Sequence, residues 1–184
     1  PLKTALHTLS SALHFVRTYG PSFRIYLSSL SKAEKALIDS HGVKKAVENL
    51  REYQRMAFES TPIPAPLKSL KITSWGYEYE LDLNNNNFSD GIPVQVAVRL
   101  YIASIWILIA SFSAARTTSL LTLRRNCFVQ SPIDGLFDLI LRIPKSSERW
   151  ELEELHRPIP DLIYDYGLEF AAFVSEIEER RGLF

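Results

Sequence analysis

The hydrophobic pattern of this chain is dominated by a central stretch, residues 92–125, that contains a long uncharged run. Leu100 to Ala115 holds 16 residues without a charge, between Arg99 and Arg116. A helix that spans a bilayer needs about 20 predominantly apolar residues, so this run predicts a helix buried in a protein core. Apolar residues recur at helical spacing and the gaps are also apolar, so we expect neighbours on most of its sides. The recurring positions are Val96, Leu100, Ala103, Ile107 and Ala110.

The first 60 residues alternate between amphipathic segments and short breaks, which predicts a small helical domain. Gly20-Pro21 and His41-Gly42 supply two of the breaks, because glycine and proline commonly end helices. Residues 61–66, Thr-Pro-Ile-Pro-Ala-Pro, then predict a semi-rigid extended spacer. The expected helices cover residues 2–19, 22–30, 32–40 and 43–59, the last with Val47, Leu50, Tyr53 and Ala57 facing inward.

The remaining segments predict a little β-structure and a final helix. Residues 67–83 alternate in places and favour a strand, and the four asparagines at 84–87 favour an exposed loop. Residues 137–144 form a nearly continuous apolar strand, and 150–155 return as its hairpin partner. Residues 161–181 predict an amphipathic helix with Leu162, Ile163, Tyr166, Phe170, Phe173 and Ile177 on its buried side. The expected fold class is therefore mainly α with a small antiparallel β-sheet, or α+β.

Arg116 falls at the break that follows the central helix. Helical propensity drops at residues 112–115, and the hydroxyls of residues 117–119 could cap a second short helix, Leu120 to Arg125. An arginine in this position could close the helix C-terminus by a favourable dipole contact. It could also offer a guanidinium fork to a phosphate oxygen, as phosphoryl transfer on DNA requires.

The order of these features resembles the first half of the catalytic domain of the tyrosine recombinase (phage integrase) family. The shared features are the buried helix, the small-residue turn, Arg116, the run Thr-Ser-Leu-Leu-Thr-Leu-Arg-Arg at 118–125, and Leu-Ile-Leu-Arg-Ile-Pro-Lys at 139–145. The resemblance implies that Arg116 is the family's first catalytic arginine and Lys145 its hairpin lysine, a general acid. It also implies cutting and rejoining of DNA through a 3′-phosphotyrosyl intermediate, without metal or nucleotide cofactor.

The resemblance also implies a domain division. Residues 1–60 would be a helical DNA-clamping domain, 61–91 a linker, and 92–184 the first half of a partial integrase-like catalytic domain. We therefore expect a fragment of a site-specific recombinase.

Two departures from the family pattern bear on activity. Ser119 stands where the family usually has an acidic residue three positions after its arginine. No His-x-x-Arg with a later tyrosine follows Lys145, and neither Tyr164 nor Tyr166 has the position of the family's nucleophile. We expect the chain to be inactive on its own, because it lacks that nucleophile.

The charge distribution is asymmetric although the formal net charge is zero. Residues 1–71 carry 11 Lys and Arg against 5 Asp and Glu, whereas residues 72–184 carry 10 against 16. A basic N-terminal part fits contact with duplex DNA, and mutual attraction of two oppositely charged surfaces fits equally well. Arg124 and Arg125 could contact phosphate or could be ordinary solvated charge. The expected DNA contacts are Arg124, Arg125, Lys44 and Lys45.

The remaining composition limits the kind of site. One cysteine, Cys127, excludes an internal disulfide framework, and four scattered histidines have no metal-ligand spacing, so we expect no metal and no cofactor. No secretory signal pattern is found, and a cytoplasmic location is expected, without a membrane partner.

Self-association is expected if helices from a missing half leave the central helix uncovered. The expected contacts are Ile102, Ile105, Trp106 and Ile109, with residues 161–181 as the second contributor. Two alternatives to the recombinase remain open. One is a non-catalytic DNA- or protein-binding module on the recombinase scaffold, and the other is a helical protein-interaction module without a nucleic-acid partner.

Overall fold

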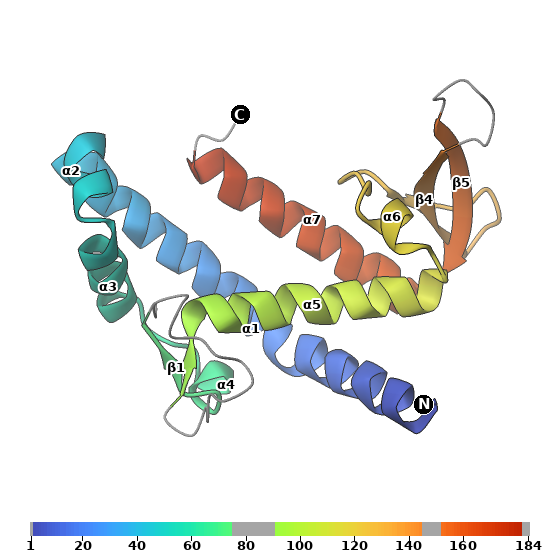
Figure 1. Cartoon of the computed structure of the whole chain (residues 1–184), viewed down its shortest axis with the longest axis horizontal. Coiled ribbons are helices and arrows are strands. Elements are labelled where there is room, and N and C mark those ends of the chain that lie inside the picture. Colours follow the sequence, from blue (N-terminus) through green and yellow to red (C-terminus); the bar gives the residue numbers. More distant parts are fainter. Residues whose placement is uncertain (1, 75–90, 145–151, 182–184) are drawn as a thin grey trace. The chain divides into compact units, whose positions relative to one another are not determined.

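The computed structural model describes residues 2–74, 91–144 and 152–181 (Figure 1). The protein is mainly α-helical with a three-stranded antiparallel sheet, which confirms the predicted fold class. The helices are α1 (Leu2–His41), α2 (Val43–Glu48), α3 (Leu50–Ser60), α4 (Ala65–Lys68), α5 (Val94–Ser113), α6 (Thr117–Leu120) and α7 (Asp161–Arg181), and the strands are β1 (Ile72–Thr73), β2 (Ile92–Pro93), β3 (Phe128–Gln130), β4 (Phe137–Pro144) and β5 (Leu152–Ile159).

Contacts between residues divide the chain into two compact units, and α1, α5 and α7 each contribute to both. The first, called the sheet unit here, contains residues 1–13 and 104–174. The second, the helical unit, contains residues 14–103 and 175–184. The predicted division at residues 60 and 91 stays a prediction.

The helical unit is built around the contact between α1 and the first half of α5. Tyr101 of α5 is fully buried, and its ring centroid lies 5.3 Å from that of Phe23 on α1. Arg24 donates a hydrogen bond from Nη1 to the Tyr101 hydroxyl oxygen over 3.2 Å. A Cβ added at Gly20 would lie 3.4 Å from the Tyr101 ring, which is an ordinary van der Waals contact, so α1 lies directly against this ring with room for one methyl group.

The predicted break at Gly20-Pro21 is wrong, because α1 continues through both residues. The expected helices 2–19, 22–30 and 32–40 are therefore one helix of 40 residues. Proline weakens and kinks a helix without always ending it, and here Gly20 and Phe23 are buried against α5. Tertiary packing thus outweighs local propensity. The second predicted break is confirmed, since α1 ends at His41 and Gly42 has a φ of 82°.

The helix predicted for residues 43–59 is divided in two by Asn49. Asn49 leaves the helical conformation, with φ −120° and ψ 28°. Its side-chain amide donates to the carbonyl of Lys45 over 3.1 Å and so shares the acceptor of its own backbone N–H, which competes with the helical hydrogen bond. Tyr53 and Ala57 are buried as predicted, whereas Leu50 is 48% exposed and that prediction is wrong. The side chain of Val47 lies outside the described part.

The predicted spacer at residues 61–66 is extended only as far as Pro64. Ala65 begins α4, because proline is well tolerated in the first turn of a helix. Of the strand predicted for residues 67–83, the described part contains β1, which pairs in parallel with β2. The predicted asparagine loop at 84–87 lies outside the described residues.

The sheet unit contains the strands in the order β3–β4–β5, all antiparallel. The bounds of β4 confirm the predicted strand 137–144. Strand β5 covers Leu152–Ile159 and so continues past the predicted end at residue 155, whereas residues 150 and 151 of the prediction lie outside the described part. Leu139, Leu141 and Ile159 on one face of this hairpin are buried. The other face carries polar side chains, which are described with the candidate site.

Helix α7 has the predicted bounds, Asp161–Arg181. Ile163 is buried as predicted, but Leu162 is 37% exposed and does not belong to the buried side. Tyr166, Phe170 and Phe173 are half-buried, and the side chain of Ile177 lies outside the described part.

Helix α5 is covered on fewer sides than predicted. By length and composition alone it is apolar enough to cross a membrane, and 44% of its most apolar window is buried in the protein. Ile105 and Ile109 are buried, so they are not available as the predicted self-association contacts. Leu100 and Ile102 are 43% and 41% exposed. Trp106, Ile107 and Ala110 are half-buried, and Ala103 is exposed.

Candidate nucleic-acid interface

The turn between α5 and α6 carries Arg116 to the surface. Ser113, the last residue of α5, is buried, and its hydroxyl accepts a hydrogen bond from the Ala115 backbone N–H over 3.3 Å. Ala114 between them has a φ of 50°, a left-handed conformation that costs a non-glycine residue of order 1 kcal/mol or more. Arg116 follows in an extended conformation, with φ −70° and ψ 148°, and is exposed.

Helix α6 begins and ends earlier than predicted. Arg116 itself is the N-cap residue, with no side-chain cap, and the helix stops at Leu120 instead of reaching Arg125. The Thr122 hydroxyl and backbone N–H both donate to the carbonyl of Ser119, at 2.9 and 3.3 Å, which tightens the chain into a turn. Consequently Arg124 and Arg125 lie in the connection between α6 and β3, and not on a helix.

Ser119, at the position of the family's usual acid, is buried under the turn. A serine there is neutral, so it cannot hold Arg116 by an ion pair. Among the described residues the Arg116 guanidinium has no hydrogen-bond or ion-pair partner. The closing of a helix end by this side chain is therefore not observed in the described part.

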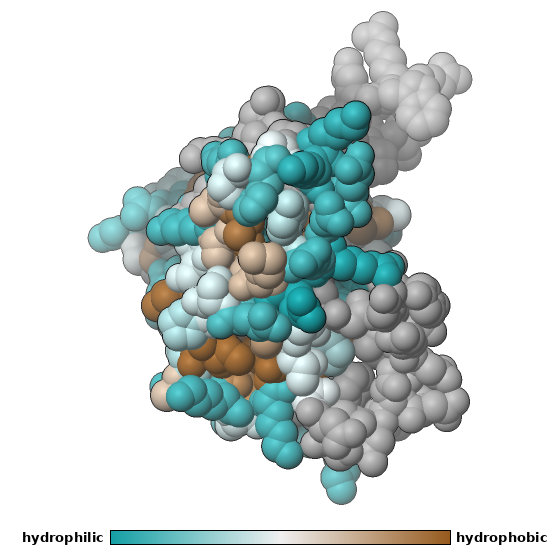
Figure 2. Space-filling view, turned by 90° about the vertical axis from the view of Figure 1, so that its left-hand side faces the viewer, coloured by the Kyte–Doolittle hydropathy of each residue, from teal (hydrophilic) through white to brown (hydrophobic). Residues whose placement is uncertain are grey.

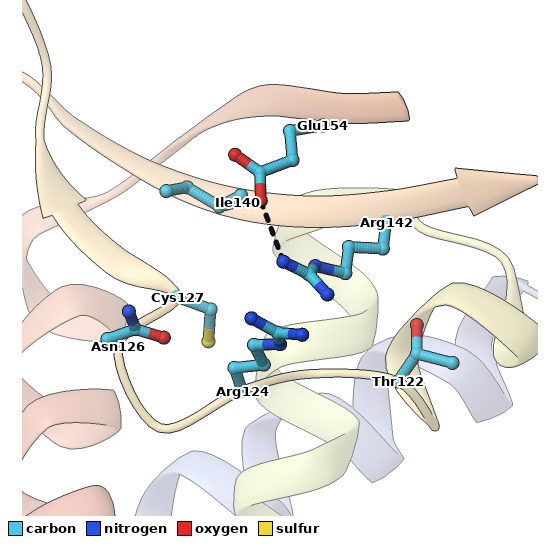
Figure 3. Close-up of a pocket in the computed structure, with 7 residues that line it drawn as sticks. All are labelled: Thr122, Arg124, Asn126, Cys127, Ile140, Arg142 and Glu154. Carbon is cyan, nitrogen blue, oxygen red and sulfur yellow. Dashed lines mark hydrogen bonds and ion pairs between the residues drawn. The ribbon is translucent and has the colours of Figure 1, made fainter. Parts of the chain in front are cut away.

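A pocket of about 110 Å³ lies between the connection that follows α6 and the polar face of the β4–β5 hairpin. Figure 3 shows the guanidinium groups of Arg124 and Arg142 pointing toward one another across it. Neither Arg116 nor Arg125 lines this pocket. The lining residues are Thr122, Arg124, Asn126, Cys127, Ile140, Arg142 and Glu154.

One cross-strand ion pair and one histidine–aspartate contact lie on the polar face of the hairpin. Arg142 Nη2 and Glu154 Oε1, on directly paired residues, are 3.0 Å apart. His156 Nδ1 and Asp138 Oδ2 are 3.4 Å apart, and the Asp138 side chain is only 7% exposed. The sequence analysis missed Arg142 as a site residue. The signal was present, because Asp138 and Arg142 are the polar residues of an otherwise apolar strand and lie four apart, on the same face.

The predicted lysine contacts lie elsewhere. Lys44 and Lys45 are exposed on the short helix α2, which belongs to the helical unit. Figure 2 views the protein from the side of α2 and α3, where hydrophilic side chains surround a smaller apolar area. Lys145, the predicted general acid, lies outside the described residues and directly follows Pro144, the last residue of β4.

The pocket has no nucleophile poised for chemistry. Burial raises the pKa of the Cys127 thiol from its usual 9.0 to about 11, so the group is neutral at physiological pH. Nor do three or more His, Cys, Asp or Glu side chains gather as a metal-binding cluster anywhere in residues 2–74, 91–144 or 152–181. The two arginines and the amide of this pocket are suited to binding an anion.

Tyr164 on α7 is part of the packing of the sheet unit. Its ring stacks on that of Phe137, with centroids 4.2 Å apart.

A comparison of the chain with protein-family models, with curated proteins and with solved structures found no match.

Proposed function

We propose that this chain is the DNA-binding part of a site-specific tyrosine recombinase, with Arg116 contacting the phosphate that is cut. The observation that carries the proposal is the exposed Arg116, which has no partner among the described residues and follows the strained Ala114. Strained backbone is often retained where it positions a functional group. The order buried helix, arginine turn, short helix and three-stranded antiparallel sheet also supports the resemblance.

The chemistry of the complete enzyme follows from the resemblance. A tyrosine oxygen attacks the phosphodiester, the bond from phosphorus to O5′ breaks, and a 3′-phosphotyrosyl bond forms. Arg116 would offset the charge that develops on the non-bridging oxygens, and Lys145 would give a proton to O5′. We do not propose Tyr164 as the nucleophile, because its ring is engaged with Phe137.

The test is the salt dependence of binding to a short duplex of mixed sequence. We expect the logarithm of the binding constant to fall linearly with the logarithm of salt concentration. Arg116→Gln should lower that slope by about 1, the effect of one lost phosphate contact, and Lys44→Gln with Lys45→Gln by about 2. Arg55→Gln is the matched control, because Arg55 is exposed and lies 3.8 Å from Glu59 on the same helix.

Two outcomes would count against the proposal. Absence of salt-dependent binding by the wild-type chain would remove DNA as the partner. An equal change of slope for Arg55→Gln would mean that the binding reports general positive charge and not contacts of Arg116.

A protein-binding module is the second candidate, and the exposed side of α5 favours it. Leu100 and Ile102 leave apolar surface of α5 in water. Ile102→Ser should then reduce self-association measured by sedimentation, whereas Ile133→Ser, at a residue 64% exposed near the β4 turn, should not. A monomer at all concentrations would leave this candidate without support. The cytoplasmic location and the absence of a membrane partner stay predictions.

A further inference from the structure

The pocket beside the β4–β5 hairpin carries an excess of positive charge. Arg124 and Arg142 contribute two guanidinium groups, and Glu154 is the only carboxylate among the lining residues. Like charges that face each other repel, and the repulsion is reduced when an anion lies between them. The described residues offer no carboxylate to Arg124, so the charge of this guanidinium is not neutralised there.

The two ion-pair partners on the hairpin, Arg142 and Glu154, differ in exposure. The Arg142 side chain is 22% exposed and is held by the strand, whereas the Glu154 side chain is 54% exposed. An exposed ion pair contributes little free energy, so a ligand can replace the carboxylate at small cost. Glu154 can then turn toward water while Arg142 keeps its position.

The pocket also offers one neutral hydrogen-bond donor, the Asn126 side-chain amide. The Asn126 amide lies on the same side as Arg124 (Figure 3). The Thr122 hydroxyl is engaged with the Ser119 carbonyl. Two guanidinium forks with one amide match the non-bridging oxygens of a tetrahedral anion, for which arginine is the preferred partner.

We infer that this pocket binds a single phosphate group between Arg124 and Arg142, and that Glu154 is the competing anion that occupies Arg142 when the site is empty. The assignment of this phosphate to the DNA backbone rests on the proposed function. A free phosphate has the same chemistry, so binding of inorganic phosphate tests the pocket itself. The pocket would hold DNA in position, at a site separate from the phosphate contacted by Arg116.

The experiment is a titration of the chain with inorganic phosphate, followed through the NMR signals of the arginine side chains. Arg124→Gln and Arg142→Gln should each weaken binding about tenfold, the loss typical of one charge-assisted hydrogen-bonding partner. Glu154→Gln should tighten binding about two- to fivefold, because it removes the competing charge at nearly unchanged shape.

Matched controls are available on the same strand. Glu153→Gln and Arg157→Gln change the charge by the same amount, but residues 153 and 157 point to the opposite face of β5 from residue 154. Both should leave phosphate binding unchanged. Equal effects of Glu153→Gln and Glu154→Gln, or no loss with Arg142→Gln, would overturn the inference.

A parallel titration with duplex DNA separates this inference from the proposed function. If phosphate binds as described but DNA does not, the pocket stands and the proposed function fails. If DNA binds with its salt dependence unchanged by Arg124→Gln and Arg142→Gln, the proposed function stands and the pocket inference fails.

Discussion

Arg24 in the helical unit has surroundings opposite to those of Arg116 and Arg124 in the sheet unit. In the helical unit, Arg24 is half-buried and donates to the Tyr101 hydroxyl, so its charge is used in the packing of α1 against α5. In the sheet unit, Arg116 and Arg124 are exposed and have no partner among the described residues. A hydrogen-bonded arginine in a core stabilises the fold, whereas an exposed one contributes little. Arg24 therefore holds the structure, and the other two are available to a ligand.

The helix glycines of the two units also differ, in the space that their neighbours leave for a side chain. A Cβ at Gly20 would lie 3.4 Å from Tyr101, an ordinary contact at the edge of crowding. A Cβ at Gly167 would lie 2.3 Å from the ring of Phe128, a distance that no real contact has. The packing of the sheet unit thus requires that Gly167 has no side chain, whereas the packing of the helical unit requires the large side chain of Tyr101.

The largest expected effect is that of removing the Tyr101 side chain. Tyr101→Ala should lower the free energy of unfolding by about 3–5 kcal/mol, as for other large aromatic residues in a core. Tyr101→Phe keeps the ring and loses the hydrogen bond from Arg24, at a cost of about 1–2 kcal/mol. Urea unfolding followed by circular dichroism measures both. A loss below about 1 kcal/mol for Tyr101→Ala would show that the α1–α5 contact does not organise the helical unit.

The two glycines should respond in opposite directions to the same substitution. Gly167→Ala should lower stability by about 1–3 kcal/mol, because Phe128 must move out of its place. Gly20→Ala should raise stability by up to about 1 kcal/mol, because alanine is the better helix former and has room for its methyl group. Thermal unfolding of the two variants side by side is sufficient. Equal shifts of both melting temperatures would contradict the predicted difference between Gly20 and Gly167.

A smaller effect distinguishes the arginines. Arg24→Gln should lower the free energy of unfolding by about 1 kcal/mol and leave the salt dependence of DNA binding unchanged. Arg124→Gln should change stability by less than about 0.5 kcal/mol, as is usual for an exposed side chain. If Arg124→Gln lowered the free energy of unfolding more than Arg24→Gln does, Arg124 would stabilise the fold and would not be free to bind a ligand.

The smallest expected effect is a loss of stability that appears only at alkaline pH. It comes from one buried titratable group in each unit, Cys127 and Tyr26. Burial raises the pKa of Cys127 to about 11, and burial with the nearby Glu34 raises that of Tyr26 from 10.0 to about 12. In each case the unfolded chain loses its proton first, so stability falls as the pH rises. The sheet unit should weaken between about pH 9 and 11 and the helical unit between about pH 10 and 12. Thiol alkylation reports the first and tyrosinate absorbance the second, and the reverse order would contradict this assignment.

The elements that could be predicted from the sequence are those whose pattern agrees with their environment. The bounds of α7 follow from its apolar periodicity, and those of β4 follow from its nearly continuous apolar run. The course of α1 could not be predicted, since the gain from packing Gly20 and Phe23 against α5 depends on a partner remote in the chain. Local rules for glycine and proline carry no information about such a partner.

The candidate site shows the same limit. Arg116 could be selected as a candidate from the sequence because it ends a long apolar run, and it is exposed in the structure, while its role stays a prediction. The proximity of Arg124 and Arg142 could not be predicted from the sequence, because it depends on the early end of α6 and on the register of the strands. Both follow from side-chain hydrogen bonds and pairing that a periodicity analysis does not contain.

The pairing of α1 with α5 also sets a condition on the synthesis of the protein. Arg24 and Tyr101 are 77 positions apart. At the usual rate of translation, roughly 4 to 15 seconds pass before the ribosome has made the partner of α1. During this time Phe23 and Tyr26, which are fully covered in the folded protein, face water and other chains. The first 41 residues are therefore the part of the nascent chain that we expect a chaperone to hold until α5 emerges.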